Sequence, residues 1–335
     1  MSTARLNIRN GLACPGVAAR LACLRLALTA VLSVITLAVT LSHVAATELA
    51  PYFWTWGGGA VSSLMDAKHQ TGLQSATIAF VTSGSGCTDD GAAIMMSDDI
   101  ERFITFGGNV TISFGGAAGT YVETACTDED QLFNLIDGII QRLGTQQLDF
   151  DVEGPQLANT QATARRIRAL RRLQGKYPTL SVSLTLPVEP NGLPTLALDL
   201  IRSTVAGGVK IAVINIMAMD YGAGTNDLGK VAIQSAEGTV EQLGTVYPSR
   251  TRAQLYGMLG ITPMIGRNDD GTMFTVSDAR QVTTYALQKG IGRLSFWALQ
   301  RDQPGVNIET SSGTQEAKFA YWQAFTAAAK SSRPN

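Results

Sequence analysis

Residues 148–154 read LDFDVEG, a run in which apolar and acidic side chains alternate. Successive side chains of a β-strand point to opposite faces, so Asp149, Asp151 and Glu153 would share one face and the apolar residues the other. If the apolar face packs against helices, the acids face the interior of a closed parallel sheet, with Glu153 nearest its carboxyl end. Two alternatives stay open: an antiparallel strand with a solvated acidic face, and a calcium or magnesium site, although no further oxygen ligands follow at loop spacing.

Other short runs of β-branched and aromatic residues recur along the chain, separated by amphipathic stretches such as 130–143, 161–174 and 277–289. Strands that alternate with helices predict an α/β fold with a parallel sheet. Eight such units over roughly 280 residues fit a single-domain (β/α)8 TIM barrel. A doubly wound sheet is the alternative, but the glycines at 57–59 lack the Gly-x-Gly-x-x-Gly spacing of its nucleotide loop. The predicted strands begin at Pro51, Thr77, Val110, Leu148, Leu180, Ile211, Leu255 and Arg293.

The composition limits the chemistry that this chain can perform. Its 335 residues are 45% hydrophobic and 16% charged with a net charge of −1, which excludes a disordered chain and does not suggest a nucleic-acid-binding protein. Only two histidines are present, His43 and His69, so a Ser-His-Asp triad or a histidine-based metal site has little scope. We therefore expect no metal and no cofactor, and chemistry that uses carboxylates, hydroxyls and aromatic rings.

The N-terminal residues have the pattern of a targeting segment. Residues 1–25 contain four arginines and no acid, an uncharged apolar run covers 26–41, and small residues precede Thr47. This pattern predicts a secretory signal over residues 1–46 that is cleaved after Ala46, and hence a secreted, extracellular protein. The alternative is an uncleaved membrane anchor over residues 26–46. If the signal is cleaved, we expect a domain over 47–335 with no stable membrane partner.

Cleavage would leave Cys87 and Cys126 as the only thiols of the chain. Two cysteines in an exported protein usually form a disulfide, which we predict here, with two separate free thiols as the alternative. The remaining histidine, His69, lies in a polar helical stretch and is expected to be solvated.

The acidic run resembles the Asp-x-x-Asp-x-Asp-x-Glu signature of the family 18 glycoside hydrolases, the chitinases and their relatives. Three further segments are similar in order and position: 113–116 to that family's Ser-x-Gly-Gly motif, 219–221 to its Met-x-Tyr, and Trp297 to an indole below the reacting sugar. The resemblance covers residues 49–330. Two positions depart from the pattern, because Gln146 replaces the first aspartate and Gly222 the aspartate after the tyrosine. Strand alternation predicts that Asp220 points outward and does not substitute for it.

The resemblance implies hydrolysis of β-1,4 bonds next to N-acetylglucosamine with retention of configuration, the substrate's own acetamide acting as nucleophile. Glu153 would protonate the leaving oxygen and then act as base, and for this it should remain protonated at mildly acidic pH. Asp151 would orient the acetamide N–H and stabilise the oxazolinium charge, and Asp149 would share a proton with Asp151. Tyr221 would donate its hydroxyl to the acetamide carbonyl.

The resemblance also implies contacts with a sugar chain. Trp297 is expected below the reacting sugar with Met219 beside it, and either Trp54 or Trp56 of the first strand would extend the site. The expected partners are chitin or N-acetylglucosamine oligomers, without nucleic acid, and the expected state is a monomer. The alternatives are an endo-β-N-acetylglucosaminidase that acts on glycans and a non-hydrolytic, lectin-like protein. The presence of Glu153 favours an enzyme.

Overall fold

The computed structural model describes residues 46–331, which belong to one compact unit. The secretory signal predicted over 1–46 and its alternative, an anchor over 26–46, lie outside these residues, Ala46 apart. The domain boundaries predicted at 47–335 stay a prediction. Between residues 46 and 331, no helix is both long enough and apolar enough to cross a bilayer.

Nine parallel strands form the central sheet, in the order β1-β11-β8-β7-β6-β5-β4-β3-β2, and two short strands, β9 and β10, form a separate antiparallel pair. In chain order the strands are β1 (Glu48–Leu49), β2 (Tyr52–Trp54), β3 (Ser75–Val81), β4 (Asn109–Gly115), β5 (Gln147–Asp151), β6 (Ser181–Pro187), β7 (Val213–Met217), β8 (Leu259–Thr262), β9 (Gly266–Arg267), β10 (Met273–Phe274) and β11 (Arg293–Leu294).

The two outer strands of this sheet are halves of one extended segment, which closes the sheet into a barrel. β1 pairs with β11, and β2 pairs with β3. Backbone N–H groups of Ala50 and Tyr52 donate to the carbonyls of Leu294 and Phe296, which continues the pairing with the last strand. Counted with β1 and β2 as one strand, the barrel has the eight parallel strands that the sequence predicts.

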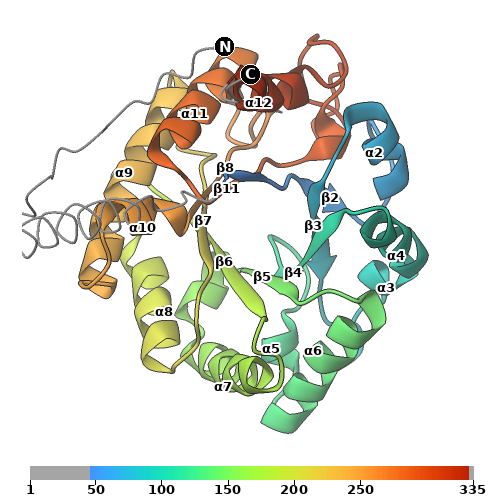
Figure 1. Ribbon diagram of the computed structural model, residues 1–335, viewed down its shortest axis with the longest axis vertical. Helices are drawn as coiled ribbons and strands as arrows, with labels where there is room; N and C mark the ends of the chain where they lie inside the picture. Colours follow the sequence, from blue (N-terminus) through green and yellow to red (C-terminus); the bar gives the residue numbers. More distant parts are fainter. Residues whose placement is uncertain (1–45, 332–335) are drawn as a thin grey trace, which may run out of the picture. The chain divides into compact units, whose positions relative to one another are not determined.

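Helices surround the barrel on its outer side (Figure 1). The predicted amphipathic stretches at 130–143, 161–174 and 277–289 correspond to α6, α7 and α11. In chain order the helices are α2 (Leu64–Thr71), α3 (Ala92–Met95), α4 (Ser97–Thr105), α5 (Val122–Ala125), α6 (Glu129–Leu143), the 3₁₀ helix η1 (Gly154–Ala158), α7 (Thr160–Lys176), α8 (Thr195–Ala206), α9 (Leu228–Val246), α10 (Arg252–Gly257), α11 (Val276–Lys289), the 3₁₀ helix η2 (Leu299–Arg301) and α12 (Ala320–Ser331).

Two predicted strands differ from the observed ones. The stretch predicted to begin at Leu255 starts as helix α10, because Thr251 and Gln254 form a capping box that satisfies the first amides of a helix, and β8 begins only at Leu259. The last strand is limited to Arg293–Leu294, and the chain continues with single backbone bonds such as Trp297 N–H to the carbonyl of Pro263.

The alternation of side chains along β5 is the one that the sequence predicts. Leu148, Phe150 and Val152 belong to the apolar core between strands and helices. The ring of Phe150 stacks on that of Phe114 from the neighbouring strand, with 5.1 Å between centroids. Asp149 lies on the opposite face, in the barrel interior. The apolar layer therefore orients the acids inward.

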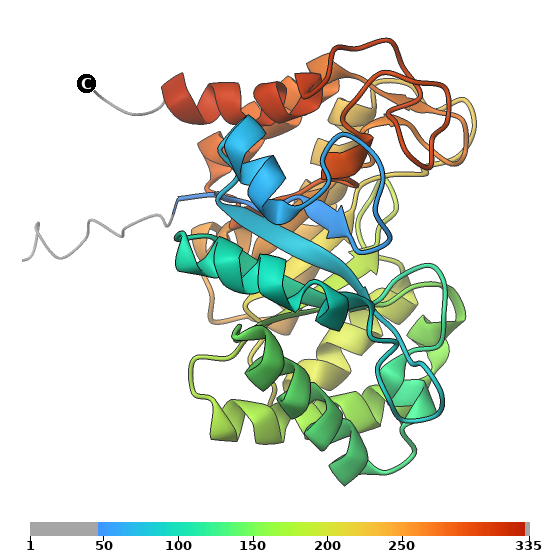
Figure 2. The same ribbon diagram turned by 90° about the vertical axis from the view of Figure 1, so that its right-hand side faces the viewer.

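The carboxyl ends of the strands carry the longer loops, which gather on the side to which the arrows point in Figure 2. Two of these loops, after β3 and β4, are joined by a disulfide between Cys87 and Cys126, as predicted. The bond closes a segment with a sequence separation of 39 residues. Cross-linking loops that are distant in sequence restricts the unfolded chain and holds this part of the rim together.

Candidate active site

A cleft of about 600 Å³ opens at the carboxyl ends of the strands. Five of the predicted site residues contribute to its lining: Trp54, Asp151, Glu153, Met219 and Trp297. A larger and more open depression, of about 1040 Å³, lies on the outer surface between α9 and α11 and contains none of the predicted site residues. The acidic strand end and the aromatic rings therefore meet in the cleft.

Asp149 lies below the cleft, buried in the barrel interior. Both of its carboxylate oxygens accept hydrogen bonds from hydroxyl groups on neighbouring strands. A carboxylate needs such donors when it is removed from water, because burial without them is costly. The donors are Tyr52 at 3.2 Å, Ser113 at 2.7 Å, Ser183 at 2.7 Å and Thr185 at 2.9 Å.

Asp151 lies two residues further along β5, on the same face as Asp149. It is 4% exposed and reaches the cleft. Its Oδ1 atom has no hydrogen-bond partner among the described residues. Burial, followed by the charges of Glu153 and Asp149, raises the pKa of Asp151 well above its ordinary value. Asp151 therefore gives up its proton less readily than an ordinary aspartic acid, and its Oδ1 atom is free to bind a ligand.

The residues of the motif at 113–116 hold Asp149 and allow β4 to lie close to β5 at this strand end. Ser113 donates to Asp149, whereas Gly115 has φ of 102° and lies so close to β5 that a Cβ atom would overlap the carbonyl oxygen of Asp151. Gly116 N–H donates to that same carbonyl at 3.0 Å. The glycines thus allow β4 to approach the backbone that carries Asp151.

Glu153 follows β5 and begins the 3₁₀ helix η1, with its side chain partly exposed in the cleft. Its backbone N–H donates to the hydroxyl oxygen of Tyr121 at 2.9 Å, which fixes the chain as it leaves the strand. Burial, then the charges of Asp220 and Asp269, raise the pKa of Glu153 to about 7. Its carboxyl group is therefore protonated at mildly acidic pH.

Asp220 lines the cleft, so the prediction that it points outward is wrong. β7 ends at Met217, and Asp220 has φ of 52°, so the alternation of a strand no longer applies. Its Oδ1 atom accepts the N–H of Asp270 at 3.1 Å, and its own N–H donates to Asn268 at 3.2 Å. These contacts hold its carboxylate beside Glu153, where it acts on the pKa of that group.

Tyr221 is absent from the lining of the cleft, and the structure contradicts its predicted contact with a substrate. Its hydroxyl lies 3.0 Å from the hydroxyl of Ser235 in α9, and its ring packs against the apolar core. Met217 and Met219 point into the cleft instead. The match to Met-x-Tyr therefore fits better two residues earlier, with Met219 at the position of the tyrosine and Asp220 at that of the aspartate.

Gln146 does not take part in the site. It lies just before β5 at the amino end of the strand, exposed, and its side-chain oxygen accepts a bond from the hydroxyl of Thr179 at 2.6 Å. Gln146, which replaces the family's first aspartate, therefore makes no hydrogen bond to Asp149 or Asp151. Among residues 46–331, no group of three His, Cys, Asp or Glu side chains is arranged to hold a metal ion.

Aromatic rings form one side of the cleft. Trp297 is partly buried and stacks on Phe80, with 5.7 Å between ring centroids. Trp54 is only 1% exposed and its indole N–H donates to the carbonyl of Gly57. Trp56, by contrast, is 61% exposed and stacks on Trp54 with 5.4 Å between centroids. Of the two candidates on the first strand, Trp56 offers the free ring and Trp54 supports it from behind.

Several cleft residues are not recognisable in the sequence. Phe80, Asp269 and Arg301 line the cleft, yet they come from different segments and carry no local motif. Asp220 and Trp56 lie next to residues that the sequence analysis recognised. Strand alternation wrongly predicted that Asp220 points outward, and it did not show whether Trp54 or Trp56 extends the site. Only the closure of the barrel brings these side chains together.

No protein-family model matches the chain. Two curated proteins are 32% identical to it: a probable bifunctional chitinase/lysozyme of Escherichia coli (strain K12), over 238 residues, and endochitinase 11 of Metarhizium anisopliae, over 249 residues. The matches cover 65% and 69% of this chain, but 26% and 48% of those proteins. The chain thus spans about a quarter to a half of the length of these relatives.

The catalytic domain of a hyperthermophilic chitinase from Pyrococcus furiosus is similar over nearly its whole length. The identity is 30% with a TM-score of 0.79, and the match covers 87% of this chain and 97% of that domain. A structure of catalytic-site mutants of active domain 2 of a chitinase from the same organism, complexed with chito-oligosaccharides, matches with a TM-score of 0.78.

Replacement of Asp220 by asparagine removes the charge that contributes most, after burial, to the raised pKa of Glu153. We therefore expect Glu153 to titrate below about 7 in D220N, because a neighbouring negative charge disfavours ionisation. Carbon-13 NMR of labelled glutamate carboxyls measures this directly. Glu309→Gln is the matched control, since Glu309 lines the same cleft but is not among the charges that act on Glu153. An unchanged titration in D220N contradicts the assignment.

Proposed function

Because this chain belongs to family 18 of the glycoside hydrolases, we propose that it is a chitinase that hydrolyses β-1,4 linkages next to N-acetylglucosamine with retention of configuration. One arrangement carries the proposal: Glu153, whose pKa burial and neighbouring carboxylates raise to about 7, lies beside the buried Asp151 in a cleft that also holds the exposed ring of Trp56 and the partly buried ring of Trp297. The resemblance to chitinases agrees with this arrangement.

Glu153 is the general acid and base of the proposed reaction. A carboxylic acid can protonate a leaving oxygen only while it holds its proton, and a pKa of about 7 meets this condition at mildly acidic pH. Burial is the largest cause, and the carboxylates of Asp220 and Asp269 add to it. After the bond breaks, the ionised Glu153 accepts a proton from the attacking water.

Asp151 assists the acetamide group, which replaces a protein nucleophile in this family. Its Oδ1 atom, free of protein partners, is available to accept the acetamide N–H and to stabilise positive charge that develops on the oxazolinium ring. Asp149 is the second carboxyl of the pair, and four hydroxyl donors hold it in place below Asp151. Two neighbouring carboxyls with a retained proton can shift that proton as the charge above them changes.

The acetamide carbonyl would have no tyrosine donor from β7 in this site. Tyr221 bonds to Ser235 outside the cleft, and Met219 takes its place. The tyrosine that does line the cleft, Tyr52, already donates towards Asp149 and Thr185. We therefore assign the orientation of the acetamide chiefly to Asp151, with Met219 as an apolar neighbour.

Aromatic rings provide the sugar affinity in this proposal. Flat aromatic rings complement the apolar faces of pyranoses and can bury a large apolar area against them. Trp297 forms the floor under the reacting sugar. Trp56 stacks on Trp54 at the exposed end and provides a platform for a further sugar unit.

A glycan other than chitin is the second candidate substrate. The Escherichia coli relative is described as a probable bifunctional chitinase/lysozyme, which points to peptidoglycan as well as chitin. Product analysis after incubation with defined N-acetylglucosamine oligomers, with peptidoglycan and with a high-mannose glycoprotein separates these substrates from one another.

We also propose that the protein is exported and acts as a monomer. The disulfide between Cys87 and Cys126 supports export, because such bonds persist in oxidising compartments. Mass analysis of the mature protein should give a chain that begins at Thr47 and contains no free thiol. A mature chain that still contains residues 26–46 contradicts cleavage and favours the anchor, and light scattering reports the oligomeric state.

Replacement of Glu153 by glutamine should lower kcat on chito-oligosaccharides by roughly 10²–10⁴-fold, the contribution of a positioned acid–base group. Binding should persist, since the amide keeps the shape of the side chain. The wild-type rate should fall as the pH rises above about 7, because the acid form of Glu153 is lost. Chromatography of the products gives the rates, calorimetry gives the affinity, and NMR of the first-formed anomer reports retention.

Glu309→Gln makes the same change of side chain in the same cleft and should keep nearly full activity. Turnover retained by E153Q, or a wild-type rate without an alkaline decline, contradicts the role of Glu153.

Replacement of Trp56 by alanine should raise KM for long chito-oligosaccharides by about ten-fold, equivalent to 1.4 kcal/mol, and leave kcat nearly unchanged. The exposed ring contributes binding, but does not touch the acids. Steady-state kinetics over a series of oligomer lengths measures the effect. Phe106→Ala removes a ring of similar exposure, 63%, that does not line the cleft, and is the control. Equal KM values for both variants contradict the platform.

A further inference from the structure

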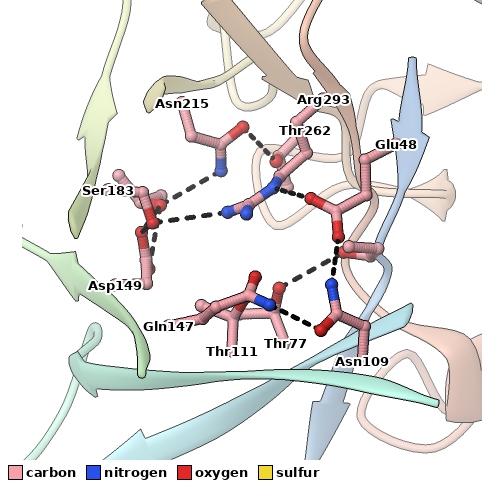
Figure 3. A network of polar contacts seen from close by, with 12 residues as sticks. Glu48, Thr77, Asn109, Thr111, Gln147, Asp149, Ser183, Asn215, Thr262 and Arg293 are labelled. Carbon is pink, nitrogen blue, oxygen red and sulfur yellow. Dashed lines mark hydrogen bonds and ion pairs between the residues drawn. The ribbon is translucent and has the colours of Figure 1, made fainter. Parts of the chain in front are cut away.

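A buried arginine lies in the barrel interior, below the acidic residues of the cleft. Arg293 of β11 is 5% exposed and reaches between two groups, as Figure 3 shows. Its Nε atom donates to the carboxylate of Glu48 in β1 at 2.9 Å, and its Nη1 atom donates to the hydroxyl oxygen of Ser183 in β6 at 3.3 Å. None of the steps proposed for the reaction uses this cation.

The hydroxyl of Ser183 connects Arg293 to Asp149. Because Ser183 accepts a bond from the guanidinium, its own proton is free to donate, and its oxygen lies 2.7 Å from Oδ1 of Asp149. The guanidinium polarises this hydroxyl in the direction that strengthens its bond to a carboxylate. One hydroxyl thus joins the buried cation to the middle acid of the strand.

The surroundings of Arg293 keep the cation in this position. Glu48, the ion-pair partner, is one-quarter exposed and also accepts a bond from Asn109 at 3.2 Å. Asn109 in turn accepts from Gln147, the residue at the start of β5 (Figure 3). A charge removed from water is costly unless it is paired and hydrogen-bonded, and these contacts meet that need in part. The other recorded bond of the guanidinium goes to the hydroxyl of Ser183, which itself donates to Asp149.

We propose that Arg293 is a positioning residue of the reaction: through the hydroxyl of Ser183 it orients the carboxylate of Asp149, and its positive charge opposes protonation of that carboxylate. The inference rests on the proposed function for its catalytic meaning. The titratable and charged groups around Asp149 are Tyr52 and Asp151 on the cleft side, and Arg293 with Glu48 on the side of the barrel base.

The sign of the pH effect follows from this arrangement. When positive charge develops above Asp151, the reaction needs Asp149 to accept the proton of the pair. Protonation of Asp149 at low pH therefore stops the reaction. Without the cation, Asp149 would take up a proton at higher pH. A neighbouring opposite charge shifts the titration of a carboxyl group by about one to three pH units. Because the charge of Arg293 acts through one hydroxyl, we expect a shift of about one pH unit, at the lower end of this range. Glu153, which sets the alkaline side, is unaffected.

The test is the pH profile of kcat on chito-oligosaccharides for Glu48→Met/Arg293→Met. Removing both partners leaves no unpaired buried charge, and such replacements are often neutral for stability. We expect the acidic limb to move about one pH unit upward, with the alkaline limb unchanged. Arg293→Lys, which keeps the charge, should return the acidic limb towards that of the wild type. Thr283→Val, which removes a buried hydroxyl whose bond to the carbonyl of Ala279 stays within α11, should leave both limbs in place.

Ser183→Ala provides a second variant that keeps the ion pair and removes only the connecting hydroxyl, and it should shift the acidic limb in the same direction. Carbon-13 NMR of Asp149 measures the same upward shift without substrate. A wild type that does not cleave chito-oligosaccharides overturns the proposed function, while the NMR titration still decides the role of Arg293. Acidic limbs and Asp149 titrations that stay unchanged in both variants overturn the inference.

Discussion

The burial of the Asp149 carboxylate is the constraint on which the rest of the site depends. The apolar residues of β5 must pack outward against the helices, so its acidic residues enter the barrel interior. There a carboxylate can exist only with donors, and hydroxyls from β2, β4 and β6 supply them. The interior of this barrel is therefore polar where a typical one is filled by branched apolar side chains. The same hydroxyls fix the orientation of Asp149 below the cleft.

Successive acids along β5 differ in their environment, which separates their chemical roles. Asp149 has a full set of donors, Asp151 has one oxygen without a protein partner, and Glu153 reaches the cleft beyond the strand end. Burial raises the pKa of both Asp151 and Glu153, but different neighbouring charges add to it. Asp149 acts on Asp151 from below, whereas Asp220 acts on Glu153 from the loop after β7. In the proposed reaction, Asp149 thus supports the pair, Asp151 orients the acetamide group, and Glu153 donates the proton.

The rim of the barrel sets what the cleft can accept. The displacement of Tyr221 towards α9 and the entry of Met219 make the wall beside the acids more apolar than the family motif suggests. On the opposite side, Trp54 supports the exposed Trp56, while Trp297 stacks on Phe80. A sugar chain in this cleft would meet rings on one side and carboxyl groups on the other.

The sequence alone determined the alternation of strands and helices, the inward direction of Asp149, Asp151 and Glu153, and the pairing of Cys87 with Cys126. The first two depend on the periodicity of apolar side chains in strands and helices, and the third on the number of cysteines. All of these can be read from a single sequence. Only the tertiary structure decided the positions of Asp220, Tyr221 and Trp56. The first two follow the end of β7, where the backbone turns at a positive φ and a period of two no longer holds. The exposure of Trp56, and the contact of Arg293 with Ser183, depend on which strands become neighbours when the barrel closes, and no local pattern records that.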